Sequence, residues 1–263
     1  AIGRVALRYN TTGCRNIAMG TNALVTNTTG NCNTALGAFT LESNNANKNT
    51  AVGYAALNAN SSGTNNAALG VNALAKNTTG SHNTAVGFIA LCANTTGANN
   101  TGLGRYAGCG ITTSSSNTAI GSLTMMAGAG AGNTAFGARA LYSITTATCN
   151  TAVGFCALGS VNNKNNTAVG FFANPYLTTE QNTIAIGMCA MTTGGNSNHT
   201  VWGNSSNNAC NCVYVAWSVV SDCRDKTNVK ALPDNLGLKF IKKIKPVVYN
   251  WDNRETYVRE CGY

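Results

Sequence analysis

Cysteine, histidine and acidic side chains are the residues of this sequence that could bind a metal or drive catalysis. The 263 residues include 11 Cys, 2 His and 8 acidic residues. The spacings of the cysteines match neither a zinc-binding nor a redox pattern. Cys210 and Cys212 are too close together to form a metal site without nearby partners, and His82 and His199 are isolated. We therefore expect no metal, no cofactor, and buried or half-buried free thiols.

Charge is sparse in this chain. Lys, Arg, Asp and Glu make up 10% of the residues, and the formal net charge is +9. The first 220 residues hold eight scattered basic residues and only Glu42 and Glu180 as acidic residues, and the other nine basic residues lie in residues 221–263. Scattered charge does not form the basic face of a nucleic-acid binder, and two carboxylates give no convincing pair for glycoside hydrolysis. We therefore expect no nucleic-acid binding. No apolar run is long enough to cross a bilayer, so we also expect no membrane insertion.

A short repeat dominates the sequence and must position any functional residue. Its core is Asn-Thr-Ala-Val-Gly or a close variant, as in residues 49–53, 83–87 and 150–154, and its glycines recur every 16 or 17 residues. An apolar residue precedes each glycine, and an Ala-Leu pair usually begins three residues after it. A constant short period is typical of a solenoid. We predict an all-β fold, a parallel β-solenoid or β-roll of about 17-residue rungs, over residues 1–208.

Stacking of identical turns explains which residue types recur. Copies of a residue lie about 4.8 Å apart in a parallel stack, where like charges repel and neutral amides hydrogen-bond from rung to rung. We predict such a ladder from the Asn that opens each repeat: Asn33, Asn49, Asn83, Asn117, Asn133, Asn150 and Asn166. The glycines are predicted corners where φ is positive or another backbone comes close: Gly20, Gly37, Gly53, Gly87, Gly121 and Gly154.

Asn-Thr-Thr-Gly segments, such as residues 10–13, 27–30, 77–80 and 94–97, are predicted to form the return bend of the rung, since Asn and Gly tolerate turn conformations. They also match the Asn-x-Thr acceptor pattern for glycosylation, but chance matches are expected in a sequence rich in Asn and Thr. The turn is the interpretation we favour. The Ala-Leu pair is predicted to point inward. Twelve rungs would span on the order of 60 Å.

The sequence changes character where the repeat ends. Residues 209–220 are predicted to form a connecting β segment, because they include a short apolar stretch of strand-forming residues. Apolar residues at helical spacing between Leu236 and Ile244 predict a helix that Pro246 ends. We expect residues 221–263 to form a small α+β segment.

The repeat resembles those of bacteriophage tail-fibre proteins, in which Asn-Thr-Ala-Val-Gly is followed by Ala-Leu and Asn-Thr-Thr-Gly. It is more loosely similar to the heads of trimeric autotransporter adhesins, which are parallel β-rolls assembled as trimers. The resemblance covers residues 1–203 and implies a virion fibre made in the host cytoplasm. Its expected partners are two further copies of itself, other virion tail or fibre proteins, and a host-surface glycan or protein receptor. Small residues along one line of each rung, where backbones could approach, agree with a homotrimer.

Residues 221–263 resemble the start of the endosialidase-type intramolecular chaperone domain found at the C-terminus of phage tail fibres and tailspikes. The similarity is carried by Ser221-Asp222, Arg224, Lys226, Asn228-Val229, Leu238, Ile241, Pro246-Val247 and Tyr249-Asn250-Trp251. In that family the domain trimerises, guides the fibre into register and then cuts itself off. The resemblance implies cleavage between Val220 and Ser221, with Ser221 as nucleophile and Lys226 as base. From the residues alone, a Ser221 that caps the following turn and a solvated Lys226 explain the same pattern.

We expect a structural virion fibre that attaches to a host surface and has no external substrate, its one reaction being autoproteolysis. A cell-surface adhesin of the autotransporter type is an alternative, which needs an export signal and a membrane anchor that we do not find in these 263 residues. An ice-binding solenoid is a third alternative, because a flat face rich in Thr and Ala suits that task. Its usual sign is a rank of Thr-x-Thr, whereas Thr-Thr pairs here occur in only some turns.

Overall fold

The structure is a computed structural model that describes residues 1–160, 162–174, 180–191, 197–198 and 200–203. All of them fall in Ala1–Cys212, the first of the two units into which the chain divides. The described part forms the predicted all-β parallel solenoid, with one three-residue strand in each rung. The strands are β1 Ile17–Met19, β2 Thr34–Leu36, β3 Thr50–Val52, β4 Ala67–Leu69, β5 Thr84–Val86, β6 Thr101–Leu103, β7 Thr118–Ile120, β8 Thr134–Phe136, β9 Thr151–Val153, β10 Thr167–Val169, β11 Ile184–Ile186 and β12 Thr200–Trp202.

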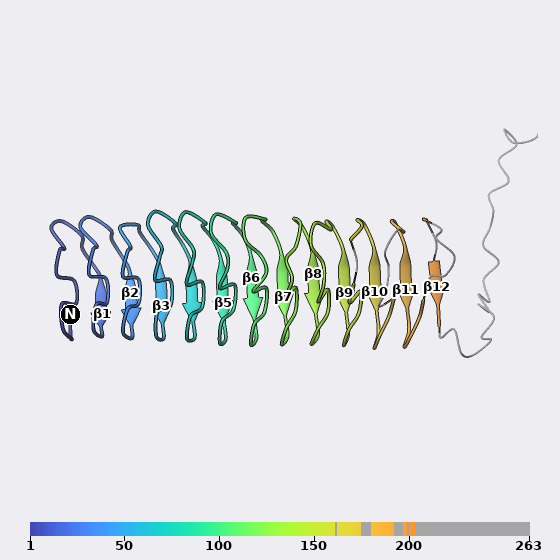
Figure 1. The fold of residues 1–263 in the computed structure, drawn as a ribbon. Helices are drawn as coiled ribbons and strands as arrows, with labels where there is room; N and C mark the ends of the chain where they lie inside the picture. Colours follow the sequence, from blue (N-terminus) through green and yellow to red (C-terminus); the bar gives the residue numbers. More distant parts are fainter. Residues whose placement is uncertain (161, 175–179, 192–196, 199, 204–263) are drawn as a thin grey trace, which may run out of the picture. The chain divides into compact units, whose positions relative to one another are not determined.

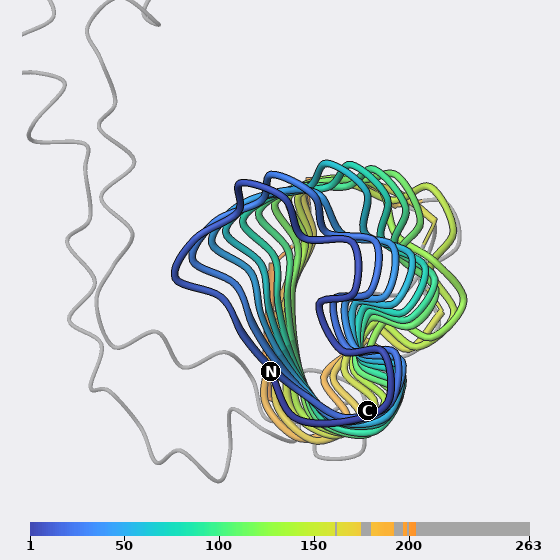
Figure 2. The same ribbon diagram turned by 90° about the vertical axis from the view of Figure 1, so that its left-hand side faces the viewer.

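Each strand pairs in parallel with the strand of the next rung, in the order β1 to β12 (Figure 1). The register repeats from rung to rung, so that Ala18 lies opposite Ala35 and Ala35 lies opposite Ala51. Figure 2 looks along the stack and shows the rungs lying behind one another with similar outlines. The prediction that the repeats are turns stacked directly over one another is confirmed.

The core consists of columns, each filled by one position of the repeat. The middle residue of a strand and the Ala-Leu pair after the corner point inward, as do the fully buried Ala51, Ala56 and Leu57. Alanine on one side of the rung and leucine on the other fill the narrow interior. The apolar residue before each glycine points outward instead, because a three-residue strand buries only its middle residue, as in β4.

A column of buried Asn runs through the positions that open the repeats. The side-chain Oδ1 of each accepts a hydrogen bond from the backbone N–H of the next rung, at 2.9–3.0 Å, without a break from Asn16 to Thr183. The Nδ2 groups donate to backbone carbonyls, as Asn33 Nδ2 does to Ala46 O at 2.8 Å. Among the described residues no buried side-chain nitrogen or oxygen lacks a partner. Full pairing matters because an unpaired buried amide costs about 1–3 kcal/mol.

A second Asn column lies in the return bend, where the sequence predicted only turn formation. Its fully buried members are Asn27, Asn44, Asn60, Asn77 and Asn94. Each donates from Nδ2 to Oδ1 of the Asn one rung before it, at 2.7–3.5 Å. Nδ2 also donates within the bend, as from Asn60 to Gly63 O at 2.9 Å. The enclosed side chains of Asn27, Asn77 and Asn94 cannot carry a glycan in the folded rung, whereas Asn10 is half-buried.

The corner glycines form a column of their own. From Gly20 to Gly187 their φ angles lie between +124° and +139°. A Cβ atom built on Gly87 would lie 2.5 Å from the carbonyl oxygen of Gly104 on the next rung. Both a positive φ and a close backbone approach therefore require glycine at this position.

Left-handed backbone is not confined to glycine. Most full rungs hold three other residues with positive φ, such as Cys32, Phe39 and Leu41 at 58°, 60° and 50°. This conformation costs about 1–3 kcal/mol for a residue that has a side chain. The cost is offset between rungs: the N–H of Cys32 donates to Cys14 O at 3.0 Å and that of Phe39 to Thr21 O at 2.8 Å. The left-handed conformation of the bends is therefore stabilised by hydrogen bonds between neighbouring rungs, and an isolated rung would not keep it.

The predicted features after the repeat lie outside the described residues. These are the connecting segment 209–220, the chaperone-like segment 221–263 with its helix, and the proposed cleavage residues Val220, Ser221 and Lys226. In the part of the chain that the structure describes, no helix is long and apolar enough to span a bilayer.

Candidate interaction face

The outer side of the sheet carries an apolar residue on every rung. The first and third residues of each strand point away from the core, and the third is always apolar: Met19, Leu36, Val52, Leu69, Val86, Leu103, Ile120, Phe136, Val153, Val169, Ile186 and Trp202. We call this row the strand-face column. Leu69 is 50% exposed, Phe136 55% and Trp202 58%. Large side chains of this kind are left in water within a single chain.

A second row lies immediately after the corner glycines; from Tyr54 to Met188 it is mostly apolar and is interrupted by Arg105 and Ser122. Its large members are Tyr54, Val71, Phe88, Phe155, Phe171 and Met188. Two rings of this row on successive rungs are in contact: the centroids of Phe155 and Phe171 are 5.5 Å apart in a stacked arrangement. Only one glycine separates this row from the strand-face column. Contiguous exposed apolar surface marks a site of interaction with another molecule.

The first residue of each strand completes the face and is uncharged on all twelve strands. It is Thr on nine of them: Thr34, Thr50, Thr84, Thr101, Thr118, Thr134, Thr151, Thr167 and Thr200. The outer face of the sheet therefore carries no charge in either of its two columns. Copies of such a face can pack against one another without like-charge repulsion.

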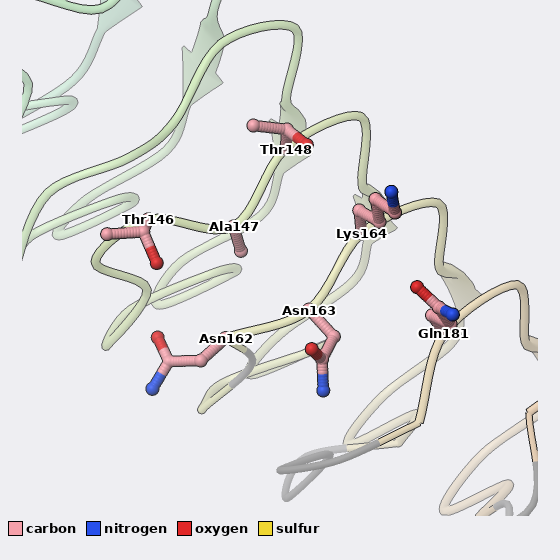
Figure 3. Close-up of a pocket in the computed structure, with 7 residues that line it drawn as sticks. All are labelled: Thr146, Ala147, Thr148, Asn162, Asn163, Lys164 and Gln181. Atoms are coloured by element: carbon pink, nitrogen blue, oxygen red, sulfur yellow. The ribbon is translucent and has the colours of Figure 1, made fainter.

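A polar pocket of about 170 Å³ lies among the bends of three successive rungs (Figure 3). It is lined by Thr146, Ala147, Thr148, Asn162, Asn163, Lys164 and Gln181. The Oδ1 atom of Asn162 accepts hydrogen bonds from the N–H and hydroxyl of Thr145, which fixes that side chain. The volume is below the roughly 300–1,000 Å³ of sites for drug-sized ligands.

The lining of this pocket suits binding and not catalysis. Hydroxyl and amide groups exchange hydrogen bonds with the hydroxyls of a sugar, and the Lys164 ammonium attracts an anionic group. None of the lining residues is acidic, so the pocket lacks the two carboxylates that sugar hydrolysis needs. This pocket was not predicted from the sequence, because three consecutive bends of different composition create it together.

The cysteines of the described part are all free thiols. Cys14, Cys32 and Cys149 are exposed, which corrects the expectation of buried or half-buried thiols. Cys32 and Cys149 each precede a buried Asn, and the side chain at that position faces solvent. Within the described ranges no three side chains of His, Cys, Asp or Glu gather into a possible metal site.

The small residues that suggested a homotrimer lie inside each chain. Ala35 and Ala51 are fully buried, and Gly20 packs against the backbone of Gly37 in the same chain. They allow the rungs of one chain to approach closely, so they are not available to a second chain. An interface with a second chain would have to use an exposed face, and the strand-face column is a regular one that runs along all twelve strands.

Comparisons with protein-family models, with curated proteins and with solved structures found no match to this chain. The function must therefore be inferred from the solenoid and from the surfaces it displays.

Proposed function

We propose that this chain forms the shaft of a homotrimeric fibre of the bacteriophage tail-fibre type, which attaches a virion to a host surface. The observation that carries the proposal is the strand-face column, apolar on each of the twelve rungs. Exposed apolar area is stabilised by removal from water. A second and third copy offer a matching apolar residue at the same height on every rung, so association around a shared axis covers the column along its length.

The rest of the solenoid suits a shaft better than an enzyme. The strand pairing and the hydrogen bonds of the opening Asn column repeat from rung to rung, so length is added without a change in these contacts. The described residues include Glu42 and Glu180 as the only acidic side chains, and the Glu42 carboxylate accepts from Asn22 Nδ2 and Asn58 Nδ2, both at 2.9 Å. That carboxylate supports the stack. The polar pocket at Lys164 is the described feature that best suits a host-surface glycan.

The mass of the assembled chain in solution tests the proposal. Light scattering of Ser221→Ala, in which the self-cleavage proposed below is blocked, is expected to give three times the 27.0 kDa of one chain. The double variant Leu69→Glu, Phe136→Glu introduces charge on the strand-face column and is expected to reduce the assembly to monomers. Lys48→Glu is the matched control, because Lys48 is exposed and belongs to no strand. A monomeric native chain, or a trimer unaffected by the double variant, would contradict the proposed interface.

We also propose that residues 221–263 begin a trimerising chaperone that cleaves itself off between Val220 and Ser221. Its support is the resemblance of that segment to the endosialidase-type domain. Loss of the chaperone after assembly would make the fibre kinetically stable, since the released chains could not reassemble. On a denaturing gel the native full-length chain is expected to appear as two fragments, and Ser221→Ala and Lys226→Ala as one band. Equal patterns in all three would refute self-cleavage.

One observation favours a second function, ice binding. Thr occupies the first, outward position of nine of the twelve strands and so forms a rank along the sheet. The neighbouring outward position is apolar instead of a second Thr, which departs from the usual Thr-x-Thr rank. A measurement of thermal hysteresis on the native chain separates the two functions. An ice-binding protein lowers the freezing point of the solution below its melting point, whereas a fibre shaft is expected to leave the two equal.

A further inference from the structure

Two cysteines on successive rungs face each other at the surface of the solenoid. Cys92 and Cys109 hold the same position of the repeat, 17 residues apart, and their Sγ atoms are 2.6 Å apart. Both side chains are half-buried, so a small reagent can reach them. Equivalent Cα atoms of a parallel stack lie about 4.8 Å apart, inside the range of about 4.4–6.8 Å that a disulfide spans. The rung spacing therefore allows a covalent bond without a change of backbone.

The two thiols differ in acidity because they share a proton. The hydrogen bond from Cys92 lowers the pKa of Cys109 to about 7; burial opposes this shift, and the positive charge of Lys76 adds to it. The same hydrogen bond, together with burial, raises the pKa of Cys92 well above its usual range. At pH 7 about half of the Cys109 side chains are therefore thiolates, whereas Cys92 stays a thiol. A thiolate is the form that attacks a disulfide.

The pair lies where the second Asn column ends. Asn94, two residues after Cys92, is the last buried Asn of that column, and Ile111, two residues after Cys109, takes its place on the next rung. The Oδ1 atom of Asn94 accepts a 3.4 Å hydrogen bond from Asn100 Nδ2. It receives no hydrogen bond from the next rung of the column, because Ile111 has no side-chain donor. The step between these two rungs is therefore where one column of amide bonds stops, and a covalent link would reinforce it.

We propose that Cys92 and Cys109 are a modification site, a thiol pair that a small-molecule disulfide such as oxidised glutathione converts into a disulfide between two rungs. The Cys109 thiolate attacks one sulfur of oxidised glutathione, which forms a mixed disulfide and releases one glutathione thiolate. Cys92 Sγ then attacks Cys109 Sγ, the mixed disulfide breaks, and the second glutathione leaves with the proton of Cys92. The two cysteines lose two electrons, and oxidised glutathione gains them. The reaction needs only one chain, so it is independent of the proposed trimer.

Peptide mapping of the native full-length chain tests this site. The chain is incubated with oxidised glutathione, quenched in acid, alkylated and digested without reductant. We expect a peptide joined through Cys92 and Cys109 to be the main cross-link, with a loss of about 2 Da, two hydrogen atoms, from the chain mass. Cross-links that instead join other cysteines, such as Cys14 and Cys32, in equal or greater amount would overturn the proposal.

Single variants test the order of the two steps. Cys92→Ser is expected to stop at a stable glutathione adduct on Cys109, whereas Cys109→Ser is expected to leave Cys92 largely unmodified. Cys156→Ser is the control, since Cys156 is also half-buried and its loss should leave the cross-link unchanged. In the native chain the reaction is expected to be about tenfold faster than glutathione addition to the other described thiols, with a rate that rises through about pH 7. A persistent adduct on Cys109 of the native chain would contradict the second step.

Discussion

The early and late rungs of the solenoid share one buried Asn column and differ in the other. In the early rungs the bend column is filled by Asn, up to Asn94, whereas Ile111 and Ile144 fill it later, and all three are fully buried. The strand register continues across the change, with Thr84 opposite Thr101 and Thr101 opposite Thr118. The bend column must therefore be filled, but either an amide or an aliphatic side chain can fill it. The column that opens the repeats accepts no such exchange between Asn33 and Asn166.

The two ways of filling the bend column follow different rules. An Asn in this column pairs with the Asn before and after it, as Asn77 does with Asn60 and Asn94 at 2.8 Å each. An isoleucine needs only close packing and does not depend on the type of its neighbours. Amides should therefore occur in continuous runs, as they do here, and an exchange that breaks a run or leaves an amide without an amide neighbour should be costly.

The corner glycines are common to both regions, and their replacement should have the largest effect. Gly87→Ala in the early rungs and Gly154→Ala in the late ones each combine a positive φ with a Cβ placed against the next rung's backbone. We expect each to lower the free energy of unfolding by about 3–5 kcal/mol in denaturant titrations. Gly132→Ala is the control, because its Cβ would lie 3.5 Å from the nearest atom, Cys149 Sγ. Equal losses at Gly132 and Gly87 would mean that backbone contact does not set the effect.

Breaking the amide run should have the next largest effect. Asn77→Ile places the late-rung residue type among amides, removes the donor to Asn60 Oδ1 and removes the acceptor of Asn94 Nδ2. The variant also removes the hydrogen bond from Asn77 Nδ2 to Gly80 O, but that carbonyl still accepts one from Asn66 Nδ2 at 2.9 Å. We expect a loss of about 3 kcal/mol in the same titration. A loss below about 1 kcal/mol would show that the run adds packing alone.

The reverse exchange sharpens the comparison and should have the smallest effect when it extends the run. Ile111→Asn can donate to Asn94 Oδ1, so we expect a loss of no more than about 1 kcal/mol. For Ile144→Asn, the residue at the same position one rung earlier is Gly128, which has no side chain to accept a hydrogen bond from the new amide. We therefore expect the free energy of unfolding to fall by about 2 kcal/mol. Unfolding of the two variants under one set of conditions compares them directly. If Ile111→Asn proves the costlier of the two, pairing with a neighbour is not what stabilises the amides.

The features that the sequence predicted correctly are those with one residue type per position. The recurring glycines at 16 or 17 residues predicted the stacked rungs, and the inward Ala-Leu pair follows from its constant composition. The second Asn column was missed because Asn in a bend is already explained by its tolerance of turns. The left-handed positions were missed because they hold residues as different as Cys32, Lys48 and His82. At these positions inter-rung hydrogen bonds decide the conformation, which local sequence does not reveal.

The outward direction of the strand-face column was also not predicted. Apolar residues such as Leu69 and Phe136 are usually assigned to a core, and here the core space is already filled by Ala and Leu. The face therefore emerges only when the whole rung is assembled. The same is true of the pocket at Lys164, to which three bends contribute.

Electron cryo-microscopy of the native full-length chain, at a resolution that separates side chains, tests the central claim most directly. We expect parallel rungs about 4.8 Å apart, with the Asn side chains from Asn33 to Asn166 directed to the next rung, and three chains that meet along the strand-face column. Rungs whose opening Asn side chains face solvent, or a single chain with Leu69 and Phe136 in water, would contradict it.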